Sequence, residues 1–290
     1  MDKRLTDIIS VLQLEALEIN LFRGESRDIG SPQVFGGQVL GQALMAAYRT
    51  VEARHCHSLH AYFLRRGDFN APIVYQVDRS RDGHSFSSRR VVAIQHGEQI
   101  FHMACSFQTE ESGLEHAALM PDVPSPEALK DISDYPKAML EVLPEVVRRH
   151  FTMERPFEFR PVTMRNYSQP EVASPTRCVW FRAVDALPDG DAALPRCLLA
   201  YMSDYHLLDV TTQPHALSFV DLQMASIDHA MWFHRPFRFD DWLLYAIDSP
   251  NASGARGLAR GMIFTRDGTL VASTVQEGLI RLHSKTKRAV

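Results

Sequence analysis

The first part of the chain shows one helical stripe of apolar residues followed by a series of strand-like segments. A short helix-like segment at residues 8–17 comes first. Pro32 and the pair Gly36–Gly37 then mark the start of a longer helix within residues 31–51. Its apolar members recur at helical spacing and are Val39, Ala43, Leu44, Ala47 and Val51. Segments rich in β-branched and aromatic residues follow, with turn glycines between them, and predict strands over 58–66, 71–79, 85–95 and 99–108.

The same order of elements returns in the second part of the chain. Residues 177–184 predict a strand and residues 197–210 a helix, and further strands are predicted over 222–233, 242–248, 255–265 and 269–281. Two short matches support a duplication. The first pairs HAYFLRR (60–66) with HAMWFHR (229–235), and the second pairs MACSFQ (103–108) with VASTVQ (271–276). Both occur in the same order at nearly the same offset, which favours an internal repeat.

The segment between the repeats has a different composition. Prolines recur at 121, 124, 126, 136, 144, 156, 161, 170 and 175, which disfavours a regular sheet. EVVRRHF (145–151) predicts one short helix. We therefore predict an N-terminal domain over 1–110, a Pro-rich linker over 111–175 and a C-terminal domain over 176–290. A helix before a run of antiparallel strands, used twice, indicates an α+β fold in which two curved sheets join and both helices share one face.

Composition and charge exclude several classes of function. The 290 residues carry 31 basic and 35 acidic side chains, a formal net charge of −4, which gives no electrostatic footprint for nucleic acid or an anionic membrane. The N-terminus shows no signal peptide and no apolar run is long enough to span a bilayer, so we expect a cytoplasmic protein. Buried free thiols are expected for the four cysteines, which form no Cys-x-x-Cys pair and are Cys56, Cys105, Cys178 and Cys197.

The familiar motifs of nucleophilic, nucleotide-dependent and metal-dependent enzymes are missing. The chain has no Gly-x-Ser-x-Gly elbow, no P-loop, no Gly-x-Gly-x-x-Gly after a strand and no His-Glu-x-x-His. His55, His57 and His60 are close together but not at known ligand spacings, and we interpret them as polar positions along a strand. No cofactor and no metal are therefore predicted.

Polar side chains interrupt several apolar segments. Helical spacing places Asp204 on one face with Ala200, Tyr201, Leu207 and Leu208, and a carboxylate among apolar residues needs a partner. Gln108 and Gln276 occupy matching places in the repeat, and a buried amide costs free energy unless it is hydrogen-bonded. Strand alternation places Ser226 on one face with Asp228, Ala230 and Trp232, and places Ile227, His229, Met231 and Phe233 on the other. From the pattern alone, a structural role for each polar residue remains the alternative.

Four segments together resemble the acyl-CoA thioesterase II family. They are VFGGQVLGQAL (34–44), HSLHAYFLRRGD (57–68), IDHAMWFHRPF (227–237) and LVASTVQEGLIR (270–281). The resemblance covers nearly the whole chain and implies a double hotdog fold and hydrolysis of acyl-CoA to a fatty acid and coenzyme A. The family's catalytic set is an aspartate on the second hotdog helix, a Thr or Ser before Ile-Asp-His, and the Gln of Val-Gln-Glu-Gly. Matched position by position, the resemblance implies Asp204, Ser226 and Gln276.

This set suits direct attack by water on a thioester. An aspartate is ionised at neutral pH and takes a proton from water, while a hydroxyl and an amide hold the water and orient the carboxylate. We expect no acyl-enzyme. For Gln108, the sequence predicts a structural or substrate-lining role, because the first predicted helix offers no counterpart of Asp204.

Two other functions remain open at this stage. One is an enoyl-thioester hydratase, although Asp204 begins no Asp-x-x-x-x-His motif and His206 lies off its helical face. The other is an acyl-CoA-binding module without turnover. The candidates for contact with coenzyme A phosphates are Arg65, Arg66, Arg256 and Arg260. A homo-oligomer, dimer or tetramer, is expected from the resemblance.

Overall fold

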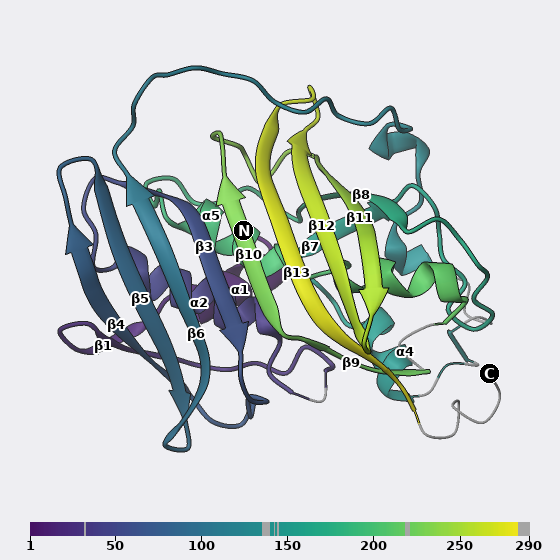
Figure 1. Ribbon diagram of the computed structural model, residues 1–290, viewed down its shortest axis with the longest axis horizontal. Helices are drawn as coiled ribbons and strands as arrows, with labels where there is room; N and C mark the ends of the chain where they lie inside the picture. Colours follow the sequence, from purple (N-terminus) through teal and green to yellow (C-terminus); the bar gives the residue numbers. More distant parts are fainter. Residues whose placement is uncertain (32, 135–139, 142, 144, 218–220, 284–290) are drawn as a thin grey trace.

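One antiparallel sheet runs through the whole protein. The computed structural model describes residues 1–31, 33–134, 140–141, 143, 145–217 and 221–283. Within these residues, thirteen strands pair in the order β1-β2-β4-β5-β6-β3-β10-β13-β12-β11-β8-β7, with β9 paired to β13 (Figure 1). Their bounds are β1 Glu15–Glu18, β2 Leu21–Gly24, β3 His55–Phe63, β4 Ile73–Asp82, β5 Phe86–Gln95, β6 Glu98–Gln108, β7 Phe157–Pro161, β8 Thr176–Ala183, β9 Leu222–Ser226, β10 Asp228–Phe233, β11 Leu243–Ser253, β12 Arg256–Thr265 and β13 Leu270–Leu282.

The strand order is symmetric about the junction between β3 and β10. Moving outward from this junction, β6, β5, β4 and β2 on one side correspond to β13, β12, β11 and β8 on the other. The first repeat thus contributes β2, then a helix, then β3–β6. The second contributes β8, then a helix, then β10–β13, preceded by the extra strand β9. The helices are α2 (Gly36–Tyr48) and α5 (Leu194–Ser203). The predicted internal repeat and continuous sheet are confirmed.

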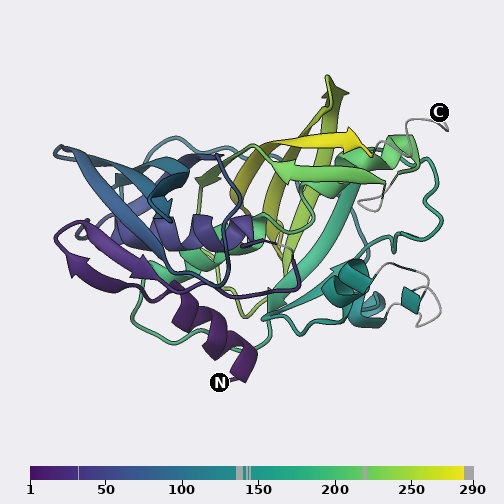
Figure 2. The same ribbon diagram turned by 90° about the horizontal axis from the view of Figure 1, so that it is seen from below.

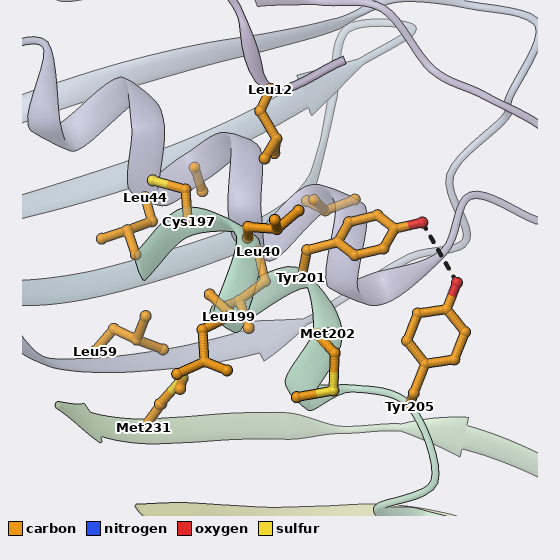
Figure 3. Close-up of a cluster of buried hydrophobic side chains, with 14 of the residues drawn as sticks. Leu12, Leu40, Leu44, Leu59, Cys197, Leu199, Tyr201, Met202, Tyr205 and Met231 are labelled. Carbon is orange, nitrogen blue, oxygen red and sulfur yellow. Dashed lines mark hydrogen bonds between the residues drawn. The ribbon is translucent and has the colours of Figure 1, made fainter. Parts of the chain in front are cut away.

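Both repeat helices lie on the same side of the sheet and pack against each other (Figure 2). Helix α2 is buried on all sides from Gly37 to Ala47. The sequence pattern predicted burial of one face only. Its polar Gln42 is satisfied because the amide donates to the Val11 carbonyl at 2.6 Å and accepts from the Tyr75 hydroxyl at 2.7 Å. The helix α1 (Lys3–Leu12) covers the pair from outside and buries Leu12 at their junction (Figure 3).

Two glycines allow the close approach of α2 and α5. A Cβ atom on Gly37 would lie 2.2 Å from the backbone oxygen of Tyr201, and one on Gly41 would lie 2.9 Å from that of Cys197. Distances this short exclude a side chain unless the helices separate. Below this contact, Leu40, Leu44 and Leu199 of the two helices interdigitate and face Leu59 and Met231 of the central strands (Figure 3). The contact therefore joins the two repeats through one core.

The second repeat helix is shorter than predicted. The sequence pattern extends it to Val210, whereas α5 ends at Ser203 with Asp204 as its C-cap. A left-handed residue, His206, follows, and the chain continues into a separate 3-10 segment, Leu208–His215. Asp204 consequently shares no helical face with Leu207 and Leu208. The end of the helix places Asp204 at a corner of the chain, between α5 and the 3-10 segment.

The segment between the repeats returns to the sheet. It contains the 3-10 turns Pro126–Ala128 and Ile132–Asp134, the helix α4 (Glu145–Thr152) at the predicted place, and the edge strand β7. The prolines were expected to disfavour a regular sheet here, and the described part of the segment adds one short strand, with Pro161 at the end of an edge strand, where a missing N–H is tolerated. The chain passes from β6 across the top of the sheet to its far edge (Figure 1). Pro32, Pro136 and Pro144 lie outside the described residues.

The two sequence matches that suggested duplication pair residues that face opposite sides of the sheet. His229 is fully buried whereas His60 is exposed, and Gln276 is fully buried whereas Gln108 is only half-buried. Core-facing positions of β6 are 101, 103, 105 and 107, so Gln108 points to the outer face. The repeat is thus present in the order of strands and helices. Residues matched in these two motifs, however, do not take equivalent positions in the two halves.

The helices were compared with the length and apolar character of a membrane-spanning helix. Within the described part of the chain, none of the helices combines the length and the apolar character needed to cross a bilayer.

Replacing Gly37 tests the close contact of the helices. Gly37→Ala is expected to lower the free energy of unfolding by about 1–3 kcal/mol, because the added methyl group forces the helix backbones apart. Alanine's higher helix propensity opposes this loss only in part. Urea unfolding followed by circular dichroism measures the change. Gly113→Ala is the matched control, since nothing lies within 4 Å of a Cβ there. Equal stability of the two variants would contradict this account of the packing.

Candidate active site

Asp204, Ser226 and Gln276 converge at one point between the repeat helices and the sheet. The Gln276 amide nitrogen donates to Asp204 Oδ1 at 2.7 Å and lies 3.0 Å from Ser226 Oγ. The Ser226 hydroxyl points to the same Asp204 oxygen at 3.4 Å. The three residues come from the end of α5, the end of β9 and the middle of β13. The structure therefore brings together all three residues implied by the sequence resemblance.

A break in the strand at Ile227 turns Ser226 towards this point. Ala230 lies opposite Val275, whereas Ser226 lies opposite Gly278, so β9 and β10 together hold one residue more than the matching stretch of β13. One extra residue reverses which side chains face the core. The predicted alternation, which placed Ser226 on the opposite face from His229, was wrong for this reason. Both side chains contact the Gln276 amide.

The Asp204 carboxylate also joins the two repeats directly. Its Oδ2 accepts the backbone N–H of Gly37 at 2.9 Å, in the first turn of α2. The local N-cap residue of α2 is Phe35, whose side chain makes no capping hydrogen bond. Asp204 therefore caps a helix from which it is separated by 167 residues. The N-terminal end of a helix carries partial positive charge, which stabilises a carboxylate placed against it.

A buried histidine completes the network and was not singled out by the sequence. His229 is 0% exposed. Its Nδ1 lies 3.2 Å from the Gln276 amide nitrogen and its Nε2 lies 2.9 Å from Ser203 Oγ. Burial is the main cause that lowers the pKa of His229 to about 4, against the opposing charge of Asp204. The ring is thus neutral at neutral pH. The sequence signal that could have found it is a histidine on the same predicted strand face as Ile227, Met231 and Phe233.

A cavity of about 190 Å³ opens onto this cluster. Ser226 and Ala225 line it from the second repeat, and Gly36 lines it from the N-terminus of α2. The rest of its wall comes from the first repeat and is mainly apolar, with Gln33, Val34, Val39, Phe63, Leu64, Arg65, Arg66, Gly67, Ile100 and Phe101. A substrate in this cavity would contact both repeats. The candidate residues Asp204, Ser226 and Gln276 belong to the second repeat, whereas most of the cavity wall belongs to the first.

Of the remaining candidate residues, Arg65 and Arg66 line the cavity beside Ser226. Gln108 donates to Glu111 at 3.2 Å on the surface, so the expected equivalence with Gln276 was wrong. Of the histidine trio, His57 contacts Ser106 at 2.8 Å along the outer sheet face. The arginines divide into two groups, since Arg65 and Arg66 line the cavity, whereas Arg256 and Arg260 pair with Glu277 and Asp248 on neighbouring strands.

Comparison with known proteins gives a consistent result. A family model described as acyl-CoA thioesterase matches residues 146–279, and one described as acyl-CoA thioesterase N-terminal domain matches residues 23–108. Acyl-CoA thioesterase 2 of Haemophilus influenzae is 44% identical over 97% of this chain and 99% of its own length. The chain belongs to the acyl-CoA thioesterase family. This confirms the resemblance seen in the sequence, and with it the assignment as a thioester hydrolase.

Solved structures of related proteins agree with the family and the fold. Acyl-CoA thioesterase II TesB2 from Mycobacterium marinum is 44% identical, with a TM-score of 0.77 and coverage of 96% of this chain and 98% of that one. A protein of unknown function with a hot dog fold from Alicyclobacillus acidocaldarius is 19% identical, with a TM-score of 0.77 over 96% of this chain and 98% of its own. The predicted α+β double hotdog architecture of this thioesterase family member is thus confirmed.

The chemistry available at the site is acid–base chemistry. Among the residues that the structure describes, no group of three or more His, Cys, Asp or Glu side chains is arranged to hold a metal ion. The cluster offers one carboxylate, one hydroxyl and one amide in mutual contact, and the hydroxyl, from Ser226, lines the cavity. Such a set can orient a water molecule and accept its proton.

The two glutamines provide a matched pair of substitutions. Gln276→Ala is expected to lower kcat for acyl-CoA hydrolysis about 100-fold or more, because Asp204 loses its shortest side-chain partner and the buried pocket loses an amide. Gln108→Ala, on the outer face, is expected to leave kcat unchanged. Release of free thiol from an acyl-CoA substrate measures both. A similar loss in the two variants would mean that the asymmetry between the repeats is not functional.

Proposed function

We propose that this protein hydrolyses acyl-CoA to a fatty acid and free coenzyme A, with water activated by Asp204, Ser226 and Gln276. The observation that carries the mechanism is the convergence of a carboxylate, a hydroxyl and an amide within hydrogen-bonding distance of one another, with Ser226 in the cavity wall. Membership of the acyl-CoA thioesterase family supports the choice of substrate. Each of the three side chains has a distinct part in the reaction.

Asp204 is the general base. Its carboxylate takes one proton from the water while the water oxygen bonds to the thioester carbonyl carbon. The carbon–sulfur bond then breaks, and its electron pair leaves on sulfur. Asp204 returns the proton to this sulfur, which gives free thiol and carboxylic acid. Ser226 and Gln276 hold the water and the carboxylate in line, and general-base assistance of this kind contributes about 10²–10⁴ in rate.

The N-terminus of α2 supplies the stabilisation of negative charge. Gly37 donates its N–H to Asp204, and Gly36 lines the cavity next to it. A Cβ atom on Gly36 would lie 2.8 Å from Asp204 Oδ2, so the backbone comes close to the reacting groups only because this residue is glycine. Partial positive charge at the helix end favours the oxyanion that forms on the carbonyl oxygen.

A panel of acyl-CoA thioesters of graded chain length tests the proposed activity. Wild-type protein is expected to release free thiol, and Asp204→Asn is expected to lower kcat by about 10²–10⁴ because the amide accepts no proton. Thiol release also separates hydrolysis from hydration of an enoyl thioester, which liberates no thiol. Binding of the thioesters without release would support a non-catalytic module. Near-wild-type turnover by Asp204→Asn with its fold intact would remove this residue from the mechanism.

Direct attack by water predicts that no covalent intermediate forms. Ser226 lies 3.4 Å from Asp204 and has no histidine in hydrogen-bonding contact with its hydroxyl among the described residues, so it lacks the usual base for a nucleophilic serine. Intact-protein mass spectrometry after rapid mixing with substrate is expected to show unmodified protein at every time point. An adduct of acyl mass on Ser226 would replace this mechanism with a two-step one.

The setting of the reaction is also a proposal. We propose that the enzyme acts in the cytoplasm as a dimer or tetramer. The free thiols of Cys56, Cys105 and Cys197, all buried, fit a reducing compartment, as does Cys178, which is half-buried. The division into domains 1–110 and 176–290 with a linker over 111–175 is proposed on the same basis as the repeat. Light scattering measures the assembly size.

A further inference from the structure

We propose that His229 is a positioning residue that keeps the Gln276 amide turned towards Asp204 throughout the reaction. The inference rests on the proposed function, since it assigns a task within the same site. It starts from a buried chain of hydrogen bonds that leads away from the cavity. The chain runs from Asp204 through Gln276 and His229 to Ser203 and ends at the Ala200 carbonyl.

The direction of this chain follows from counting hydrogens. The Ser203 hydroxyl donates to the Ala200 carbonyl at 2.8 Å, which uses its single hydrogen. Ser203 Oγ can therefore only accept from His229 Nε2, at 2.9 Å. A neutral imidazole carries one hydrogen, so a hydrogen on Nε2 leaves Nδ1 as an acceptor. The Gln276 amide nitrogen, 3.2 Å away, is then its donor: one of its two hydrogens is directed to Asp204, and the other is shared between His229 Nδ1 and Ser226 Oγ.

The buried surroundings keep the ring in this state. His229 is fully buried, and burial lowers its pKa to about 4, so the ring stays neutral at neutral pH. The segment that sets its tautomer is itself tied to the sheet, because the Tyr245 hydroxyl donates to the Ser203 carbonyl at 3.0 Å and contacts Thr274 at 2.8 Å. Ser203 is 0% exposed, so water does not compete for its hydroxyl.

The orientation of the Gln276 amide decides whether a hydrogen-bond donor or an oxygen faces the Asp204 carboxylate. With its nitrogen inward, Gln276 donates to Asp204 Oδ1 at 2.7 Å. With the amide reversed, an oxygen would face both the carboxylate and the lone pair of His229 Nδ1, and both contacts would be repulsive. As a carboxylate, Asp204 holds the amide without help. Once Asp204 has taken the proton from water, its attraction for an N–H donor falls, and the acceptors that remain are His229 Nδ1 and Ser226 Oγ. The effect of His229 therefore falls on kcat.

Two substitutions separate this role from simple packing. His229→Phe fills the volume of the ring without an acceptor, and His229→Asn retains an oxygen on the side of Nδ1. We expect kcat for acyl-CoA to fall about 10–100-fold in His229→Phe, with KM within about twofold, because a buried amide donor loses its partner. His229→Asn is expected to recover at least part of this loss. Wild-type kcat in His229→Phe, or equal loss in both variants, would overturn the proposal.

A measurement on the wild-type protein removes dependence on how well the variants fold. The ¹⁵N NMR spectrum of the imidazole rings at neutral pH, with His229 assigned from the signal missing in His229→Asn, reports the tautomer. We expect a neutral ring protonated on Nε2. A ring protonated on Nδ1, or on both nitrogens, would overturn the proposal. Failure of the proposed function looks different, because the wild-type enzyme would then release no thiol from any acyl-CoA while the ring kept the same tautomer.

Discussion

The close contact between α2 and α5 is the constraint on which the rest of the molecule depends. Gly37 and Gly41 let the two helix backbones meet, and this contact places the end of α5 against the beginning of α2. Asp204 thereby reaches the N–H of Gly37 and takes the place of the capping side chain that Phe35 does not supply. This one hydrogen bond thus links the two repeats at the site, stabilises a helix end and orients the carboxylate proposed to act as the base.

The buried polar groups of the site are tolerated because almost every one has a partner. Gln276 and His229 are both fully buried, and leaving either donor or acceptor unpaired would cost about 1–3 kcal/mol. The network satisfies Gln276 Nε2 and both ring nitrogens of His229. Gln276 Oε1 has no hydrogen-bond partner among the described residues. This acceptor belongs to the amide of the proposed catalytic set, where it is open to a hydrogen bond from water or substrate.

The two repeats have diverged in chemistry while keeping one architecture. Core-facing positions of β3 and β6 carry apolar side chains and the thiols of Cys56 and Cys105, whose pKa values are raised by burial. The corresponding strands of the second repeat carry His229 and Gln276 at buried positions. The first repeat instead supplies most of the cavity wall and the helix N-terminus. Each repeat therefore needs the other, since neither holds a complete site.

Local pattern in the sequence determined most of the elements and the residue types of the site. Helical and alternating periodicity located α2 and the long strands, because each buries one continuous set of side chains, and the motif resemblance pointed to Asp204, Ser226 and Gln276. Tertiary structure decided what periodicity does not carry. An inserted residue at Ile227 turned Ser226 inward, and the end of α5 at Ser203 freed Asp204 to reach α2. His229 gained its place only through partners more than 20 residues away, since a hydrogen-bond network depends on distances in space that no local spacing records.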